Sequence, residues 1–229
     1  MVTTWHELGR PQVHGHDIEC VTFLRDFQFA SGAEEKVIRV FDAPQSFLQS
    51  FSNIAGVEMP SKLFESRALT AVVPALNLSN KAVFEGQEAA AVETKAEFEV
   101  QDDEETGGAD SQEAADHRPV ILDHPPFEEQ LFQGTLWVEV EKMYGHPYEI
   151  FCVQADHSHL YMASTSKAAH AEHAIIRIWD TKTYKQLSVL TGHALTVTQL
   201  AFSHSDEYLL SASRDRSWAL FKKTGDAAE

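Results

Sequence analysis

Apolar and polar residues alternate in three separate stretches of the chain, and each stretch follows a Gly-His pair. Behind each pair come a short apolar segment, a Ser-containing segment, a turn and a segment that ends in an aromatic residue. Alternation with a period of two predicts half-buried β-strands. The pairs are Gly15-His16, Gly145-His146 and Gly192-His193, and the predicted strands cover residues 18–23, 27–32, 37–41, 150–153, 160–164, 175–179, 185–190, 197–202, 208–213 and 218–221.

The second and third pairs lie 47 positions apart, which is close to the length of one WD40 blade. A blade is a four-stranded sheet of a β-propeller, and it buries its faces only against neighbouring blades. The chain resembles WD40 proteins in this spacing and in its strand pattern. The predicted fold class is therefore all-β, with WD40 β-propeller blades. Three blades are too few for a whole propeller, so we expect part of a larger scaffold.

The WD40 resemblance implies a hydrogen-bonded chain in each blade, formed by the Gly-His histidine, a Ser or Thr, an Asp in the next turn and a Trp. Each of these groups is partly buried and costs about 1–3 kcal/mol if it is left without a partner. The third repeat matches this pattern at His, Ser and Asp but has Phe in place of Trp. The first repeat has Glu in place of Asp and Phe in place of Trp. In the second repeat, residues 167–173 lengthen the turn in which the Asp is expected. The structural candidates are His193, Ser211, Asp215 and Phe221; His16, Ser31, Glu35 and Phe41; and His146, Ser164 and Trp179.

The alternation fails between residues 52 and 135, a stretch rich in proline and acidic residues. We expect an acidic inter-domain connection with short ordered pieces, the best of them at residues 74–84 with a strand at its end, and weak helix at 85–97. The predicted domains are 1–51, the end of one propeller; 52–135, the connection; and 136–229, about two blades that begin a second propeller. Further strands are predicted at 3–8 and 47–51, the outer strands of two blades, and at 136–140, which we assign to a neighbouring blade.

Charge and composition exclude several classes of function. The formal net charge is −17, and the acidic run between residues 85 and 116 carries most of it. Phosphate contact needs clustered Lys and Arg, so direct nucleic-acid binding is not expected. No apolar run approaches the roughly 18 residues of a membrane span. Cys20 and Cys152 occupy matching strand positions, which favours buried thiols in a reducing compartment over disulfides.

Catalytic and metal-binding motifs are not expected either. The histidines at 157, 159, 170 and 173 have no cysteine beside them, and zinc sites usually need four Cys or His ligands at defined spacings. We interpret them as surface-loop histidines. The sequence contains no nucleophile elbow, phosphate loop or dinucleotide fingerprint. We therefore predict no catalytic residues, no metal and no cofactor.

Several blocks that lie mostly outside the repeat consensus resemble the WD40 subunit of the Elongator complex. They are residues 5–7, 10–15, 27–41, 73–84, 136–137, 139–146, 148–153, 167–169, 172–173 and 176–179. This resemblance implies two seven-bladed propellers in the family. It also implies a non-catalytic scaffold beside the large scaffold subunit and the catalytic radical-SAM/acetyltransferase subunit, in the complex that modifies wobble uridines of tRNA. The expected compartment is the cytoplasm, with the nucleus as a second one.

Two other functions remain open at this point. The chain could be a WD40 adaptor for protein–protein contacts in a different complex, for example in chromatin or ubiquitin-ligase assemblies. A metal-dependent enzyme is a more distant alternative. Co-purification with other Elongator subunits distinguishes the first two functions, and metal analysis of the purified protein tests the third.

Overall fold

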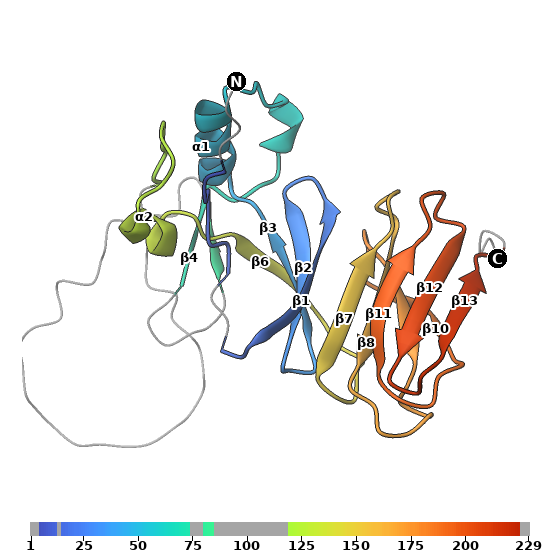
Figure 1. Ribbon diagram of the computed structural model, residues 1–229. Coiled ribbons are helices and arrows are strands. Elements are labelled where there is room, and N and C mark those ends of the chain that lie inside the picture. Colours follow the sequence, from blue (N-terminus) through green and yellow to red (C-terminus); the bar gives the residue numbers. More distant parts are fainter. Residues whose placement is uncertain (1–4, 13–14, 74–79, 85–118, 225–229) are drawn as a thin grey trace, which may run out of the picture.

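The computed structural model describes residues 5–12, 15–73, 80–84 and 119–224. Among these residues the blade strands form three antiparallel sheets that lie side by side, and two short strands form a fourth (Figure 1). The predicted blade strands are confirmed with small shifts at their ends. Sheet 1 contains β1 (Ile18–Arg25), β2 (Gln28–Ala33), β3 (Ile38–Asp42) and β6 (Val138–Met143). Sheet 2 contains β7 (Ile150–Ala155), β8 (Tyr161–Ser166), β9 (Ile176–Asp180) and β10 (Gln186–Leu190). Sheet 3 contains β11 (Val197–Phe202), β12 (Tyr208–Ser213) and β13 (Trp218–Lys222).

The first two strands pair in the same register in all three sheets. Val21, Val153 and Leu200 lie opposite Ser31, Ser164 and Ser211, respectively, and an irregularity follows the first paired residue in every case. A bulge bends its strand and is a positional feature of a fold. The three sheets are therefore copies of one unit, and a residue of one sheet has a definite equivalent in the others.

Each sheet packs face to face on the next, and apolar side chains fill both interfaces. We call the side of a sheet that turns toward the preceding sheet its front face and the opposite side its back face. The back face of sheet 1 packs on the front face of sheet 2 through a cluster that includes Leu24, Val40, Ile150, Val153 and Met162. The back face of sheet 2 packs on the front face of sheet 3 through Ala163, Ile176, Val197, Leu200 and Leu209.

Gly32 allows sheets 1 and 2 to approach closely. A Cβ atom at Gly32 would lie 2.2 Å from Cγ2 of Ile150 and 2.8 Å from Sγ of Cys20. The equivalent position in sheet 2 holds Thr165, which faces the smaller Val197 and donates a hydrogen bond from its hydroxyl to the Val197 carbonyl (3.0 Å). At this position the first interface pairs a residue without a side chain with the larger Ile150, and the second pairs the larger Thr165 with the smaller Val197.

We expect Gly32→Ala to lower the free energy of unfolding by about 1–3 kcal/mol, because the added methyl group overpacks this interface. Urea unfolding measures the effect. In a double-mutant cycle with Ile150→Ala, which removes the clashing methyl, the double variant should be more stable than the sum of the single changes predicts. Strict additivity of the two changes would contradict the assigned contact.

The fourth strand of sheet 1 comes from beyond the predicted connection. Strand β6 pairs with β3, from Ile38 opposite Met143 to Asp42 opposite Val138. Sheet 1 is the neighbour of sheet 2, so the assignment of residues 136–140 to a blade next to the second repeat is confirmed. Residues 47–51 are not a strand but part of helix α1 (Gln45–Ala55). The predicted domain boundaries at residues 51 and 135 both fall between two strands of the same sheet, so the connection is an insertion within one blade.

Helix α1 forms because the apolar residues Phe47, Leu48, Phe51 and Ile54 recur at helical spacing. Pro44 precedes its first turn, and Gly56 ends it in the left-handed conformation, with φ of 64°. The rest of the insertion contains the 3₁₀ turn η1 (Ser61–Leu63), the paired strands β4 (Thr70–Val72) and β5 (Lys81–Val83), and helix α2 (Glu128–Gln133). Strand β5 confirms the strand predicted at the end of residues 74–84.

Buried polar contacts fix the insertion to the N-terminal segment. The Asn80 side chain is 1% exposed, and its amide group donates to the carbonyls of Pro11 (2.8 Å) and Trp137 (2.7 Å). Residues 5–12 contain no strand, so the described part of the strand predicted at 3–8 is absent. The helix predicted at residues 85–97 and most of the ordered piece at 74–84 lie outside the described residues. Within the described part of the chain, no helix is long and apolar enough to cross a membrane.

Candidate functional site

The third blade brings three of its predicted side chains together. Nε2 of His193 lies 2.8 Å from the hydroxyl of Ser211, and Nδ1 lies 3.0 Å from Oδ2 of Asp215. A carboxylate only accepts hydrogen bonds, so Nδ1 carries the proton and donates it to Asp215. Phe221 stands in place of Trp and supplies no N–H donor. The Ser211 hydroxyl donates its one proton to Nε2 and lies 3.3 Å from the Ala219 carbonyl, which is its other possible acceptor. The chain of contacts joins the loop before β11 to the turn before β13.

Asp215 is the most strongly hydrogen-bonded carboxylate of this blade. It accepts from the hydroxyl and backbone N–H of Ser217 and from the backbone N–H of Ala194 (2.9 Å), as well as from His193. The Ser217 hydroxyl and the Ala194 N–H stabilise the charged form and hold the pKa of this carboxyl far below its usual range. Asp215 therefore stays ionised and organises the turn around it.

We expect Asp215→Asn to lower the midpoint of thermal unfolding at pH 7. The pKa of Asp215 is lower in the folded than in the unfolded protein, so its contribution is complete above the unfolded value of about 3.9 and is lost as the pH falls below it. The difference between wild type and variant should thus shrink as the pH falls below about 4. Asp17→Asn, at an exposed carboxylate before β1, is the matched control. Equal midpoints at pH 7 would contradict the assigned role.

The second blade forms a different chain of contacts, which ends at a histidine. The indole N–H of Trp179 donates to the hydroxyl of Ser164 (2.6 Å), which lies 2.7 Å from Nε2 of His146. Because the indole can only donate, the Ser164 hydroxyl is free to donate to Nε2, which places the imidazole proton on Nδ1. Nδ1 is buried and has no hydrogen-bond partner among the described residues. The swollen turn at residues 167–173 supplies no equivalent of Asp215.

Burial keeps His146 neutral. Desolvation, with a smaller contribution from Arg177, lowers the pKa of His146 to about 3. Its side chain is held between the loop before β7 and the Ser-bearing strand β8. The second blade therefore contains a buried imidazole that cannot take up a proton at neutral pH.

In the first blade the structure separates the predicted residues. The hydroxyl of Ser31 is buried and has no hydrogen-bond partner, so it does not contact His16, which lies on the exposed surface. Phe41 is buried and stacks on Phe29 with 5.1 Å between the ring centroids. Glu35 does not replace the missing Asp. The expected hydrogen-bonded chain does not form here, because Phe41 has no N–H donor and Glu35 is bound elsewhere.

Glu35 belongs instead to an ion-pair network that the sequence did not reveal. The Arg39 guanidinium binds both carboxylate oxygens of Glu35, at 2.6 and 3.0 Å, and both of Glu139, at 3.1 and 3.3 Å. The Glu139 side chain is only 5% exposed. Arg39 lies on β3 and Glu139 on β6, so the network joins the two strands on either side of the insertion. We call these three residues the Arg39 network.

A second contact that the sequence did not reveal joins neighbouring blades. Asp206, in the turn between β11 and β12, accepts from the backbone and ring nitrogens of His157 (both 2.9 Å) and from the Ser158 N–H (2.7 Å). Desolvation opposes ionisation of Asp206, but these hydrogen bonds prevail and lower its pKa. A local sequence signal could not indicate this pairing, because the partners lie on different blades.

The remaining histidines and both cysteines have structural surroundings. Besides the His157 contact, His173 pairs with Glu172 at 3.1 Å. The described residues contain no group of three or more His, Cys, Asp or Glu side chains placed to hold a metal ion. Cys20 and Cys152 are both free, and burial raises the pKa of the Cys20 thiol to about 12. Such thiols remain protonated and pack as small apolar groups.

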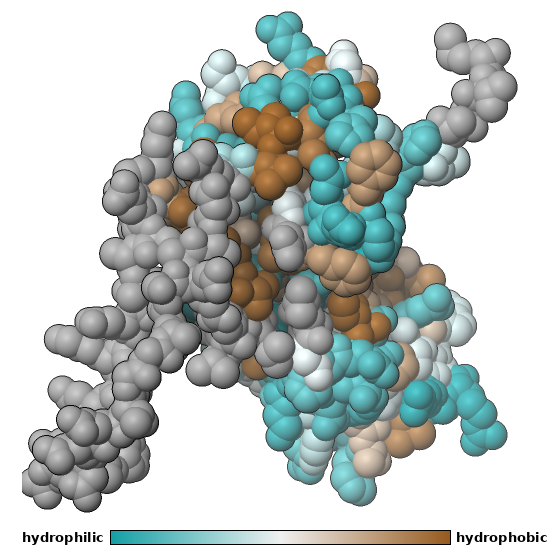
Figure 2. Space-filling view, turned by 90° about the vertical axis from the view of Figure 1, so that its left-hand side faces the viewer, coloured by the Kyte–Doolittle hydropathy of each residue, from teal (hydrophilic) through white to brown (hydrophobic). Residues whose placement is uncertain are grey.

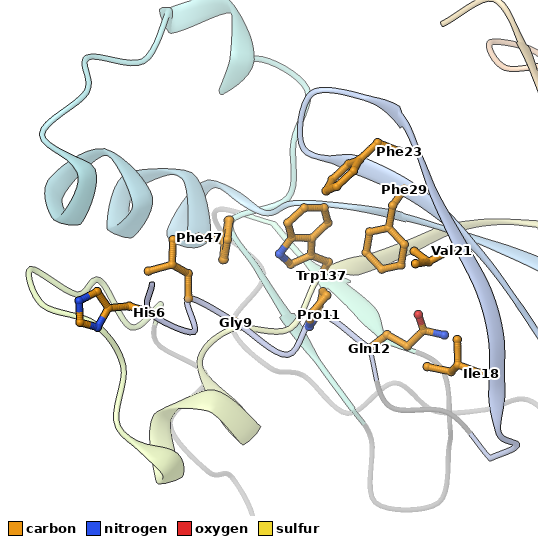
Figure 3. A pocket seen from close by; sticks show the side chains of 11 residues that line it. His6, Gly9, Pro11, Gln12, Ile18, Val21, Phe23, Phe29, Phe47 and Trp137 are labelled. Carbon is orange, nitrogen blue, oxygen red and sulfur yellow. The ribbon is translucent and has the colours of Figure 1, made fainter. Parts of the chain in front are cut away.

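Sheet 1 also borders an apolar groove of about 500 Å³. Hydrophobic residues are exposed among polar ones on this side of the molecule (Figure 2). Val21 and Phe23 of β1 line the groove on one side and Phe47 of α1 on the other. Trp137 lies between them, with its ring 5.1 Å from that of Phe47 (Figure 3). One wall of the groove thus comes from β1 and another from the insertion, and most of the lining side chains are apolar.

Comparison with known proteins agrees with this geometry. The model of the family "WD domain, G-beta repeat" matches residues 184–222. The chain is 47% identical to Elongator complex protein 2 of Homo sapiens over 223 residues, and this alignment covers 96% of the chain and 26% of the human protein. The Drosophila melanogaster protein is 46% identical over 225 residues, and the alignment covers 96% of the chain and 27% of that protein. The Saccharomyces cerevisiae protein is 37% identical over 223 residues, and the alignment covers 97% of the chain and 27% of that protein.

These matches confirm the resemblance predicted from the residue blocks. They extend over almost the whole chain, including the insertion, and so reach well beyond the WD40 repeat itself. The chain spans about a quarter of the length of the relatives it matches. The chain is therefore similar to that quarter of Elongator complex protein 2 and contains a match to the WD domain repeat.

Proposed function

We propose that this chain is part of a non-catalytic WD40 scaffold subunit of Elongator, which supports assembly of the complex that modifies wobble uridines of tRNA. The observation that carries the proposal is the similarity to Elongator complex protein 2 over about 96% of the chain. The described polar clusters support it as well. The third-blade chain of contacts, the Arg39 network and the Asp206 contact all connect strands or loops of the scaffold.

The proposed partners are the large scaffold subunit and the catalytic radical-SAM/acetyltransferase subunit. Any iron–sulfur cluster, S-adenosylmethionine or acetyl-CoA would belong to the catalytic subunit, and we assign no cofactor to this chain. The net charge of −17 argues against direct contact with the tRNA phosphates. The proposed compartment is the cytoplasm, with the nucleus as a second one.

Affinity purification of the tagged full-length protein from its own cells tests the scaffold function. We expect the large scaffold subunit and the catalytic subunit among the recovered proteins, identified by mass spectrometry. The matched control is the Phe41→Ala variant, which empties a fully buried position of sheet 1 and should reduce the recovery. Recovery of a different assembly without any Elongator subunit would overturn the proposal in favour of a general WD40 adaptor.

The link to tRNA requires a separate measurement. Depletion of the protein should lower the fraction of modified wobble uridines in total tRNA, as measured by nucleoside mass spectrometry. Expression of the full-length wild-type protein should restore that fraction, whereas the Phe41→Ala variant should restore less of it. An unchanged fraction after complete depletion would contradict a role in this modification.

A further inference from the structure

The second blade buries two polar atoms that have no hydrogen-bond partner among the described residues. They are Nδ1 of His146 and the hydroxyl oxygen of Ser166, and these two residues are 5% and 1% exposed. His146 lies in the loop before β7, and Ser166 is the last residue of β8. Buried polar groups in native proteins are hydrogen-bonded, and each exception calls for a physical explanation.

The third blade shows what these two atoms contact when an Asp is present. By strand register, Ser213 is the equivalent of Ser166, and His193 precedes the first strand of its blade by the same distance along the chain as His146. Asp215 contacts both groups in the third blade. Its carboxylate lies 3.0 Å from Nδ1 of His193, and its backbone N–H donates to the Ser213 hydroxyl (3.2 Å). The two unpartnered atoms of the second blade are therefore the equivalents of the two that Asp215 contacts.

The swollen turn does not supply this contact in the second blade. Counted from the paired serines, Ala168 is the equivalent of Asp215, and its side chain has no hydrogen-bond acceptor. The Ala168 N–H donates instead to the hydroxyl of Thr196 (2.8 Å), and the Ala168 carbonyl accepts from the Thr196 N–H (3.1 Å). The start of the turn is therefore bound to the loop before β11 of the third blade and leaves His146 without a protein partner at Nδ1.

The second blade also lacks two of the donors that hold the carboxylate in the third blade. Asp215 accepts hydrogen bonds from the backbone N–H of Ala194 and from the hydroxyl of Ser217. Their equivalents by register are Pro147, which has no N–H, and Ile175, whose side chain cannot donate. A carboxylate would be poorly bound in these surroundings, whereas a small neutral ligand needs only one or two partners.

We propose that the second blade binds one buried water molecule between His146 and Ser166, at the place that the Asp215 side chain takes in the third blade. The water oxygen accepts from the Nδ1–H of the imidazole, and a second hydrogen bond joins the water to the Ser166 hydroxyl. Buried waters typically bind where polar groups of the protein would otherwise have no partner. The inference rests on the strand register and the buried polar atoms of this chain and not on its proposed function.

A water molecule in this place allows the swollen turn to connect blades. Nζ of Lys167 lies 3.2 Å from the carboxylate of Glu34 in the turn after β2 of sheet 1. Ala168 binds Thr196, in front of sheet 3. In the third blade, Asp215 ties the equivalent turn to the histidine of its own blade. The water therefore takes over the contact within the second blade, and the turn links this blade to both of its neighbours.

Ser166→Ala distinguishes a hydroxyl that is bound to water from one that has no partner. With the water present, the variant loses a hydrogen bond, and the midpoint of urea unfolding of the full-length protein should fall. Ser213→Ala is the matched control, because its hydroxyl has two direct partners, the Leu195 carbonyl (3.0 Å) and the Asp215 N–H (3.2 Å). An unchanged or higher midpoint for Ser166→Ala would overturn the proposal, since removal of an unpartnered buried hydroxyl does not destabilise a protein.

A crystal structure of the full-length protein that resolves ordered water tests the site directly. We expect one water molecule within hydrogen-bond distance of both Nδ1 of His146 and the Ser166 hydroxyl. Nδ1 of His193 is the internal control, because Asp215 is its partner there. A second crystal, soaked in sodium bromide, tests for an anion by anomalous scattering and should show no bromide at His146.

Two crystallographic results would contradict the proposal. Carbon atoms packed against Nδ1 of His146, or a protein group that accepts its proton, would leave no place for a water molecule. A bromide ion at Nδ1 would identify the site as one for an anion.

Discussion

Replacing Arg39 by leucine should lower the free energy of unfolding by about 3 kcal/mol, because it leaves two largely buried carboxylates without their counter-ion. The side chains of Glu35 and Glu139 are 14% and 5% exposed, and the guanidinium binds both. Removal of one partner of a buried ion pair typically costs about 3–5 kcal/mol. We expect the lower end, because Nζ of Lys142 lies 3.4 Å from Glu139 and retains part of the neutralisation.

Urea unfolding monitored by circular dichroism measures this effect. Arg39→Lys keeps the charge but cannot bind both carboxylates through a planar fork, so its loss of stability should be intermediate. Combining Arg39→Leu with Glu35→Gln and Glu139→Gln removes the uncompensated charges and should recover part of the lost stability. If the triple variant is less stable than Arg39→Leu alone, burial of charge is not the cause of the effect.

The Arg39 network also explains how one blade tolerates a long insertion between its third and fourth strands. Closing a long loop adds little entropy cost per extra residue, but the two strands on either side of the loop must still find each other. Arg39 on β3 and Glu139 on β6 provide a specific contact between these strands. The first blade lacks the complete hydrogen-bonded chain of the WD40 pattern, and the network ties its last two strands together.

The sequence predicted the blade strands well because their alternation is local. Strands β11 and β12 fall within the predicted ranges, and the other blade strands differ by a few residues at their ends. Alternation also located the fourth strand of sheet 1, predicted at 136–140, but it could not indicate that this strand pairs with β3. Its partner β3 lies on the far side of the insertion, and a β-pairing over that distance leaves no periodic signal. Helix α1 was missed because a five-residue window around Phe47 fits a strand and a helix equally well.

Contacts between side chains of the candidate site are also only partly predictable from local sequence. The three side chains of the third blade lie at the spacing of a repeat and are brought together as that spacing suggests. In the first blade, Glu35 has the charge of the missing Asp and nearly its position in the turn. The Arg39 guanidinium, four residues further along the chain, binds the Glu35 carboxylate instead. Competition between partners is decided by three-dimensional geometry. A residue-by-residue match to a repeat therefore cannot predict it.

Acidification from pH 8 to pH 4.5 should destabilise the protein by about 3 kcal/mol through His146 alone. Burial lowers the pKa of this histidine to about 3 in the folded protein, whereas the unfolded value is about 6.5. Below pH 6.5 the unfolded chain takes up a proton that the folded protein cannot accept, so stability falls by about 1.4 kcal/mol per pH unit. This loss continues until the pH reaches the folded value near 3.

Other groups titrate in the same range, so the test is a difference between two proteins. The free energy of unfolding of wild type and of His146→Gln is measured at each pH by urea denaturation, and the wild-type loss should exceed that of the variant by about 3 kcal/mol at pH 4.5. His170→Gln, at an exposed position of the swollen turn, controls for the removal of one surface histidine. Parallel pH profiles for wild type and His146→Gln would mean that the imidazole accepts a proton in the folded blade. Its Nδ1 and Nε2 would then both be donors, and the hydrogen bond that Nε2 accepts from Ser164 could not persist in its present direction.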